Sequence, residues 1–166
     1  MLQLSKKNVI FSMLEYHEIP RDGVLFVHSA FKNFARDGYS VEETLECFVE
    51  YMDKGTLLFP TMSWRYVQPD NPYFDELSTP SSTGILTEVF RTKWAERRSI
   101  HPTHSVAGRG KLVDQLLDGH HIDDTPCSAQ SPFGRLAEED ADVLMFGVSI
   151  DCCTLIHHVE EMEAID

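Results

Sequence analysis

Two histidines and a proline stand close together in the stretch 98–110, which reads RSIHPTHSVAGRG. Pro102 fixes its own φ and disfavours the helical region for His101, so we expect an extended loop here. Such a loop suits a general base, because proton transfer needs hydrogen-bond reach before it needs a matched pKa. His101 is therefore a first candidate for acid–base chemistry.

A second imidazole stands near carboxylates towards the end of the chain. His157 and Glu160 are separated by three positions and Glu161 by four, so on a helix their side chains share one face. A carboxylate beside an imidazole orients the ring and increases its basicity, as in many acid–base sites. The same spacing also fits an exposed helical pair that contributes roughly a few tenths of a kcal/mol. Both interpretations stay open from the sequence.

Other chemistries have less support. Histidine, aspartate and cysteine cluster at 120–127 and again at 152–158, but without C-x-x-C, H-E-x-x-H or H-x(3)-H spacing, so we expect no metal site. The chain has no G-x-G-x-x-G motif, no phosphate-binding P-loop and no G-x-S-x-G elbow. Dinucleotide binding, nucleoside triphosphate binding and serine hydrolase chemistry are therefore not indicated.

The elements that must position these groups alternate between strands and helices. Short apolar runs predict buried strands at 23–29, 56–60 and 142–148. Helical spacing and capping signals predict helices at 6–17, from Ser40 to near Gly55, and at 85–94, 112–117 and 154–164. Residues 61–82 read as a long loop whose aromatic side chains favour a functional role over disorder. The expected fold is an α/β three-layer sandwich with a central sheet and helices on both faces, forming one domain over 1–166.

Polar residues follow three of the expected strands, where sites in open α/β sheets gather. They are His28 and Ser29, the run Thr61–Trp64, and the run Ser149–Thr154. For Ser29 and Thr61 a helix cap or turn hydroxyl is an equally good interpretation.

The net charge limits the kinds of molecule that the protein is expected to bind. The 166 residues carry 27 acidic and 14 basic side chains, a net charge of −13. This argues against nucleic acid or an anionic membrane surface as partner. A cationic substrate would be drawn to such a surface, but a solubilising acidic exterior is the better explanation of most of these charges. The four cysteines form no disulfide framework, and neither a signal peptide nor a run long enough to span a membrane is recognisable. We expect a cytoplasmic protein.

Several segments, taken in order, resemble the aminoglycoside 3-N-acetyltransferase family, also called antibiotic N-acetyltransferases. They cover nearly the whole chain, and their combination is more specific than any one of them. The matching pieces are LFVHSA (25–30), GTLLFPT (55–61), GILTEVFR (84–91), RSIHPTHSVAG (98–108), DTP (124–126) with SPFGRL (131–136), and GV (147–148) with TLIHHVE (154–160).

The resemblance implies acetyl-CoA-dependent acetylation of a primary amine on an aminoglycoside or another aminosugar. It makes His101 the general base and Glu160 the carboxylate that orients it, with Asp124 and His157 as polar residues near that centre. It also implies which residues receive coenzyme A: Ser29, Ala30, Phe31, Lys32, Thr61 and Ser105. The loop residues Trp64, Asp70, Asp75 and Glu76 are expected to form a wall against the cationic substrate.

Family members usually continue well beyond the His-x-x-Glu helix, whereas this sequence ends shortly after it. We therefore expect a domain that is truncated relative to the family. A catalytically silent domain with a binding or interaction role is the alternative, because an uncovered sheet edge or apolar patch promotes association, including a homo-oligomer.

Overall fold

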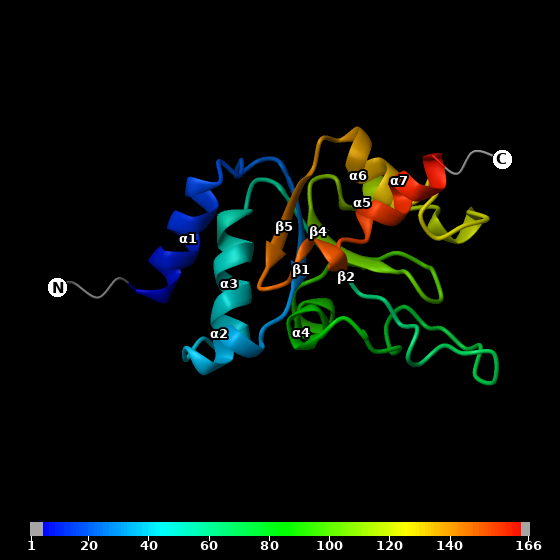
Figure 1. The fold of residues 1–166 in the computed structure, drawn as a ribbon, viewed down its shortest axis with the longest axis horizontal. Helices are drawn as coiled ribbons and strands as arrows, with labels where there is room; N and C mark the ends of the chain where they lie inside the picture. Colours follow the sequence, from blue (N-terminus) through cyan, green and yellow to red (C-terminus); the bar gives the residue numbers. More distant parts are fainter. Residues whose placement is uncertain (1–4, 164–166) are drawn as a thin grey trace.

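The computed structural model describes residues 5–163 and places one five-stranded sheet between helices on both faces (Figure 1). The strands are β1 (Val24–Ser29), β2 (Thr56–Pro60), β3 (Arg97–Arg98), β4 (Val106–Gly110) and β5 (Asp142–Phe146). The α-helices are α1 (Lys6–Tyr16), α2 (Lys32–Arg36), α3 (Val41–Tyr51), α4 (Ile85–Lys93), α5 (Val113–Leu117), α6 (Pro132–Glu138) and α7 (Leu155–Glu163). Two 3₁₀ turns, η1 (His120–Ile122) and η2 (Ile150–Cys152), complete the described elements. The predicted three-layer α/β fold is confirmed.

Side chains along the central strands point alternately to the two faces of the sheet, and each face packs against its own helix layer. Leu25 and Val27 of β1 pack in the cluster beneath α1, α3 and α4. Val24 and Phe26 pack in a second cluster with α5 and α6. Because helices cover both faces, these strands contain continuous apolar runs, as the sequence suggested.

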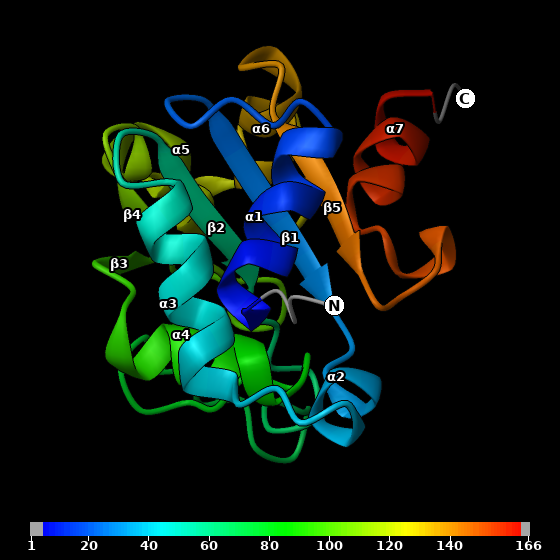
Figure 2. The same ribbon diagram turned by 90° about the vertical axis from the view of Figure 1, so that its left-hand side faces the viewer.

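The sheet order is β3-β4-β2-β1-β5, seen across the molecule in Figure 2. Strands β2, β1 and β5 are parallel, so their carboxyl ends meet at one edge. Strand β4 runs antiparallel to β2, and β3 antiparallel to β4. The chain between β2 and β4 therefore begins and ends at this same edge.

Strand β4 lies in the stretch that the sequence indicated as a loop, so for residues 106–110 that expectation is wrong. Its glycines lower strand propensity but allow close packing. A Cβ on Gly108 would lie 2.9 Å from Leu58 Cδ2, and one on Gly110, at φ 110°, would lie 2.2 Å from the Gly55 carbonyl oxygen. The intervening residues 99–105 do form the expected connection.

Capping explains where several helices begin. Ser5 accepts the Asn8 N–H at the start of α1, and Ser40 with Glu43 forms the expected capping arrangement at α3. Helices α2 and α6 were not predicted, although Ser131 caps α6 and Pro132 follows it. Of the predicted helix 154–164, residue 164 lies outside the described residues. No helix within residues 5–163 is long and apolar enough to cross a membrane.

The long segment 61–82 has no helix or strand beyond an isolated bridge between Gln68 and Asn71. It is nevertheless anchored to the sheet by Arg98. This buried guanidinium donates to the carbonyl oxygens of Thr61 (2.7 Å) and Thr79 (2.6 Å). The loop is therefore held at both ends beside the carboxyl edge of the sheet.

Candidate active site

A hollow of about 490 Å³ opens at the carboxyl ends of β1 and β2. Three residues that were predicted to bind coenzyme A line it: Ser29 at the end of β1, and Ala30 and Phe31 just after it. The start of α4, which follows Gly84, lies on another side, and Arg65 is the basic side chain among the lining residues. A helix N-terminus and a guanidinium both favour anionic groups.

Three other predicted coenzyme A residues do not line this hollow. Lys32 is exposed at the start of α2. Thr61 and Ser105 are fully buried, and the Ser105 hydroxyl donates to the Thr61 carbonyl oxygen at 2.9 Å. Their hydroxyls hold the ends of the loop together. For Thr61 this is the turn role that the sequence left open.

Two smaller hollows continue from this one. A hollow of about 170 Å³ shares Met62, Trp64, Cys152 and Thr154 with it. A hollow of about 400 Å³ then shares His104 and His157 with the small one. The three hollows thus follow one another along the carboxyl edge, and two imidazoles stand where the second meets the third.

His157 is paired with Glu160 on the exposed side of α7. Its Nδ1 lies 2.8 Å from Glu160 Oε2, one helical turn further on. Because a carboxylate accepts hydrogen bonds, the Nδ1 carries the proton and the Nε2 of the neutral ring has a lone pair. The pair has the arrangement of a general base with its orienting carboxylate.

His101 is placed differently from the prediction. Its Nδ1 accepts the backbone N–H groups of Thr103 (3.2 Å) and His104 (2.9 Å), so the proton of the neutral ring is on Nε2. It lines none of the three hollows. Within residues 5–163 no hydrogen bond joins it to Glu160, which pairs with His157. The expected His101–Glu160 pair is therefore not formed.

Burial lowers the pKa of His101 to about 4, and the nearby His120 and His104 act in the same direction. The ring stacks on His120 at 4.6 Å between centroids. The charge of Asp123 opposes the shift. A neutral ring that accepts two backbone N–H groups stabilises the bend at Pro102, which is a structural role.

His120 was not singled out from the sequence as a positioning residue. It is fully buried, and its Nε2 lies 3.0 Å from the Pro126 carbonyl oxygen. Its Nδ1 therefore accepts the Ser99 hydroxyl at 2.9 Å, and burial lowers the pKa of the ring to about 4. The loop at 126–127 in turn contacts α7, where His158 donates to the Cys127 carbonyl oxygen at 2.7 Å. These contacts link the His101 loop to the helix that carries His157.

Asp124, predicted near the catalytic centre, is exposed and has no hydrogen bond within the described residues. Its neighbour Asp123 is half-buried, and Asp123 Oδ2 is buried with no hydrogen-bond partner in the described part of the chain. Of the expected wall residues, Trp64 borders two hollows. The Asp75 carboxylate instead accepts bonds from its own loop at Ser78, and these bonds lower its pKa.

A family model described as aminoglycoside 3-N-acetyltransferase matches residues 26–166. The chain belongs to this family. Aminoglycoside N(3)-acetyltransferase IV of Salmonella sp is 31% identical over 148 residues, which cover 86% of this chain and 54% of that protein.

Two solved structures have the same fold. A variant of aminoglycoside acetyltransferase AAC(3)-IVa in complex with a gentamicin is 27% identical, with a TM-score of 0.82 over 99% of this chain and 63% of that one. AAC-IIIb in a binary complex with CoASH is 23% identical, with a TM-score of 0.82 over 96% of this chain and 66% of that one. The chain spans about half the length of the curated acetyltransferases it matches.

No group of three histidine, cysteine or carboxylate side chains that could hold an ion occurs between residues 5 and 163. The four cysteines are free thiols, and burial raises the pKa of Cys127 to about 12.

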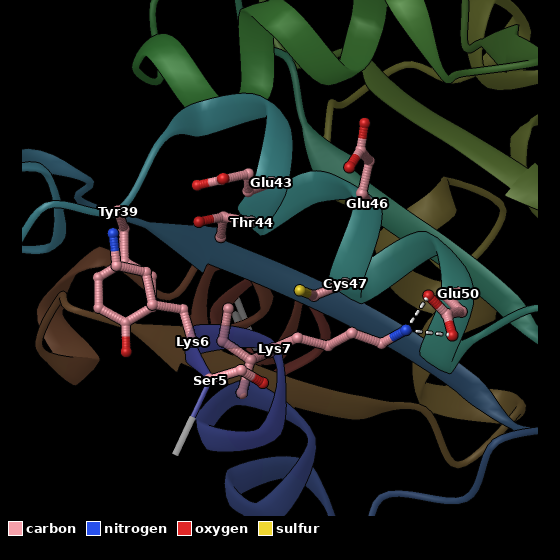
Figure 3. A pocket seen from close by; sticks show the side chains of 10 residues that line it. Ser5, Lys6, Lys7, Tyr39, Glu43, Thr44, Glu46, Cys47 and Glu50 are labelled. Carbon is pink, nitrogen blue, oxygen red and sulfur yellow. Dashed lines mark hydrogen bonds and ion pairs between the residues drawn. The ribbon is translucent and has the colours of Figure 1, made fainter. Parts of the chain in front are cut away.

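Another hollow, of about 500 Å³, lies between α1 and α3 (Figure 3). It is bordered by the carboxylates of Glu43, Glu46 and Glu50, and Lys7 crosses it to pair with Glu50 at 2.6 Å. It shares no lining residue with the three hollows at the sheet edge. We assign it no part in acetyl transfer.

Proposed function

We propose that this chain is an acetyl-CoA-dependent N-acetyltransferase that acts on a primary amine of an aminoglycoside or another aminosugar. The observation that carries the proposal is the His157–Glu160 pair at the junction of hollows that follow one another along the sheet edge. Relatives solved with CoASH and with a gentamicin support the same substrates for this chain.

The reaction needs a general base because an aminosugar amine is mostly protonated at neutral pH. The ammonium form first releases one proton to solvent. The neutral amine then attacks the thioester carbonyl carbon, a C–N bond forms, and the C–S bond breaks to release the coenzyme A thiolate. His157 Nε2 takes the second proton, which the attacking nitrogen loses as the amide forms, and can pass it to the thiolate. Glu160 stabilises the imidazolium that forms in between.

We assign the 490 Å³ hollow to acetyl-CoA. It has a turn at Ser29–Phe31, the N-terminal end of α4 and the cation Arg65, which together suit a pantetheine chain with phosphates. Ser29 Oγ is buried and has no hydrogen-bond partner in the described chain, so a ligand amide there would satisfy it.

We assign the 400 Å³ hollow to the aminosugar. Glu160 and Glu161 border it, and the chain as a whole is strongly acidic. A cationic substrate is drawn to such a surface, and the carboxylates lower the cost of bringing an ammonium group next to two imidazoles.

Calorimetric titration with acetyl-CoA, followed by a thiol-release assay with gentamicin and apramycin as acceptors, tests the proposal. We expect saturable binding and a product heavier by one acetyl group on an amine. Absence of both heat and thermal stabilisation at millimolar acetyl-CoA would overturn it.

A binding or interaction role is the second candidate, and the exposed face of α7 favours it. Ile156, Val159 and Met162 are all exposed on this helix, and β5 has no outer neighbour in the described sheet. Apolar surface and an open strand edge both promote association. Size-exclusion chromatography distinguishes the two, because a cooperatively melting monomer that binds acetyl-CoA would contradict the interaction role.

A further inference from the structure

Among residues 5–163, His104 and His157 are the two that border both the 170 Å³ and the 400 Å³ hollows. Neither the resemblance nor the preceding mechanism gives His104 a task. Its position is set by the Pro102 bend on one side and by Trp64, whose ring centroid lies 6.3 Å away, on the other.

One ring nitrogen of His104 is in hydrogen-bond contact within the protein, and the other is available to a ligand. Its Nδ1 lies 2.7 Å from the Thr103 hydroxyl. Its Nε2 has no hydrogen-bond partner within residues 5–163 and is not among the buried atoms that lack one. When the Thr103 hydroxyl donates to Nδ1, the proton of the neutral ring is on Nε2 and can be donated to a ligand.

The surroundings keep His104 neutral. Burial is the largest cause that lowers its pKa, His157 acts in the same direction, and Glu161 opposes them. A neutral imidazole beside the base is a hydrogen-bond donor that does not compete for the amine proton. The two rings are thus suited to different tasks at one junction.

We infer that His104 Nε2–H donates a hydrogen bond to the thioester carbonyl oxygen of acetyl-CoA and stabilises the negative charge that forms on it during attack by the amine. The inference rests on the proposed acetyltransferase function. No proton leaves His104: the amine proton goes to His157, and the carbonyl re-forms when the thiolate departs. A fixed donor aimed at a developing oxyanion is among the larger contributions to acyl transfer.

Geometry separates His104 from the other donor in this loop. His101 also has its proton on Nε2, but it lines none of the three hollows. Cys152 borders the small hollow, yet a thiol is a weak donor. Trp64 and Thr154 also carry neutral donors and border the small hollow, but neither borders the 400 Å³ hollow. His104 combines a neutral donor with a place where the two hollows meet.

The first test compares His104→Leu with His104→Gln in steady-state acetylation. Leucine removes the donor, and we expect kcat to fall by about 10²–10³-fold with KM for both substrates nearly unchanged. Glutamine retains an N–H donor and should recover most of that loss. Equal losses in the two variants, or full turnover in His104→Leu, would overturn the inference. Glu46→Gln in the hollow between α1 and α3 is the matched control and should behave as the unsubstituted chain.

The second test needs no turnover. Acetyl-CoA labelled with ¹³C at its carbonyl is bound to the chain, and the carbonyl resonance is followed by NMR. A hydrogen bond polarises the carbonyl, so we expect a downfield shift on binding that His104→Leu abolishes and Glu46→Gln retains. Binding with the same shift in His104→Leu would overturn the inference alone. A chain that does not bind acetyl-CoA would overturn the proposed function and this inference with it.

Discussion

His157 and His101 engage their Nδ1 atoms in opposite ways, one as a donor and the other as an acceptor. His157 donates from Nδ1 to Glu160 at 2.8 Å, which leaves the Nε2 lone pair available. His101 accepts at Nδ1 from the backbone of Thr103 and His104, which places its proton on Nε2. A general base needs an available lone pair, so the structure favours His157 over His101 for this role.

Replacing His157 should therefore affect turnover most. In His157→Ala we expect kcat to fall by about 10²–10⁴-fold with acetyl-CoA affinity unchanged, because the base is lost while the 490 Å³ hollow, which His157 does not line, keeps all its walls. Glu160→Gln should cause a smaller loss, since the imidazole remains but its imidazolium form is less stabilised. Thiol-release kinetics and calorimetry provide the two readouts. Full turnover in His157→Ala would contradict the assignment of the base.

His101→Ala should affect stability more than chemistry. The substitution leaves two backbone N–H groups without their acceptor and removes the ring that stacks on His120, at a cost of about 1–3 kcal/mol. We expect a lower melting temperature and a loss of kcat well below the ~10²-fold typical of a general base. His101→Asn, whose side-chain oxygen can accept, should recover part of the stability. A large loss of kcat with an unchanged melting temperature would restore His101 as the base.

Much of the fold was predictable because its signals are local. The apolar runs of β1 and β2 and the capping residues Ser5 and Ser40 are read from neighbouring positions. Strand β4 was not predicted, because its glycines suggested a loop. Their presence in a strand is explained by the close packing of β4 against β2, which leaves no room for a Cβ. Which strand will pack against these glycines, and so exclude a side chain there, depends on contacts between residues that are far apart in the sequence.

The site was predictable in part for the same reason. The spacing of His157 and Glu160 on one helix was visible, and their hydrogen bond follows from it. The proton position on His101 was not visible, because it depends on how the Pro102 bend folds its backbone back to the ring. His120 lies on a short 3₁₀ turn with no periodic signal, and its burial follows from tertiary packing against Phe133.

Arg98 should be essential for holding the segment 61–82 in place. The guanidinium is buried, and besides Thr61 and Thr79 it donates to Ser105 Oγ at 2.9 Å. Arg98→Met should destabilise the chain by about 2–4 kcal/mol, because several buried acceptors lose their donor at once. Limited proteolysis should then cut first within 61–82. A lysine at this position reaches fewer acceptors than arginine, so the stability of Arg98→Lys should lie between that of the unsubstituted chain and that of Arg98→Met. Unchanged protease resistance in Arg98→Met would show that the loop is held by other contacts.

Stability should fall as pH decreases from about 6.5 towards 4. Burial lowers the pKa of His28 and of His120 from 6.5 to about 4, so in this range the unfolded chain binds protons that the folded chain does not. Stability therefore rises with pH across the window and is complete above 6.5. Each of these two histidines should lower the free energy of unfolding by on the order of 1 kcal/mol when the pH falls from 7.5 to 5.5.

Urea titrations at pH 7.5 and pH 5.5 measure this difference in the free energy of unfolding, and His120→Gln should reduce it by the amount that His120 contributes. His17, exposed just after α1, provides the control in His17→Gln, which should leave the difference intact. Equal free energies of unfolding at the two pH values would mean that these rings are protonated without cost in the folded chain, and the neutral tautomer of His120 would then be wrong.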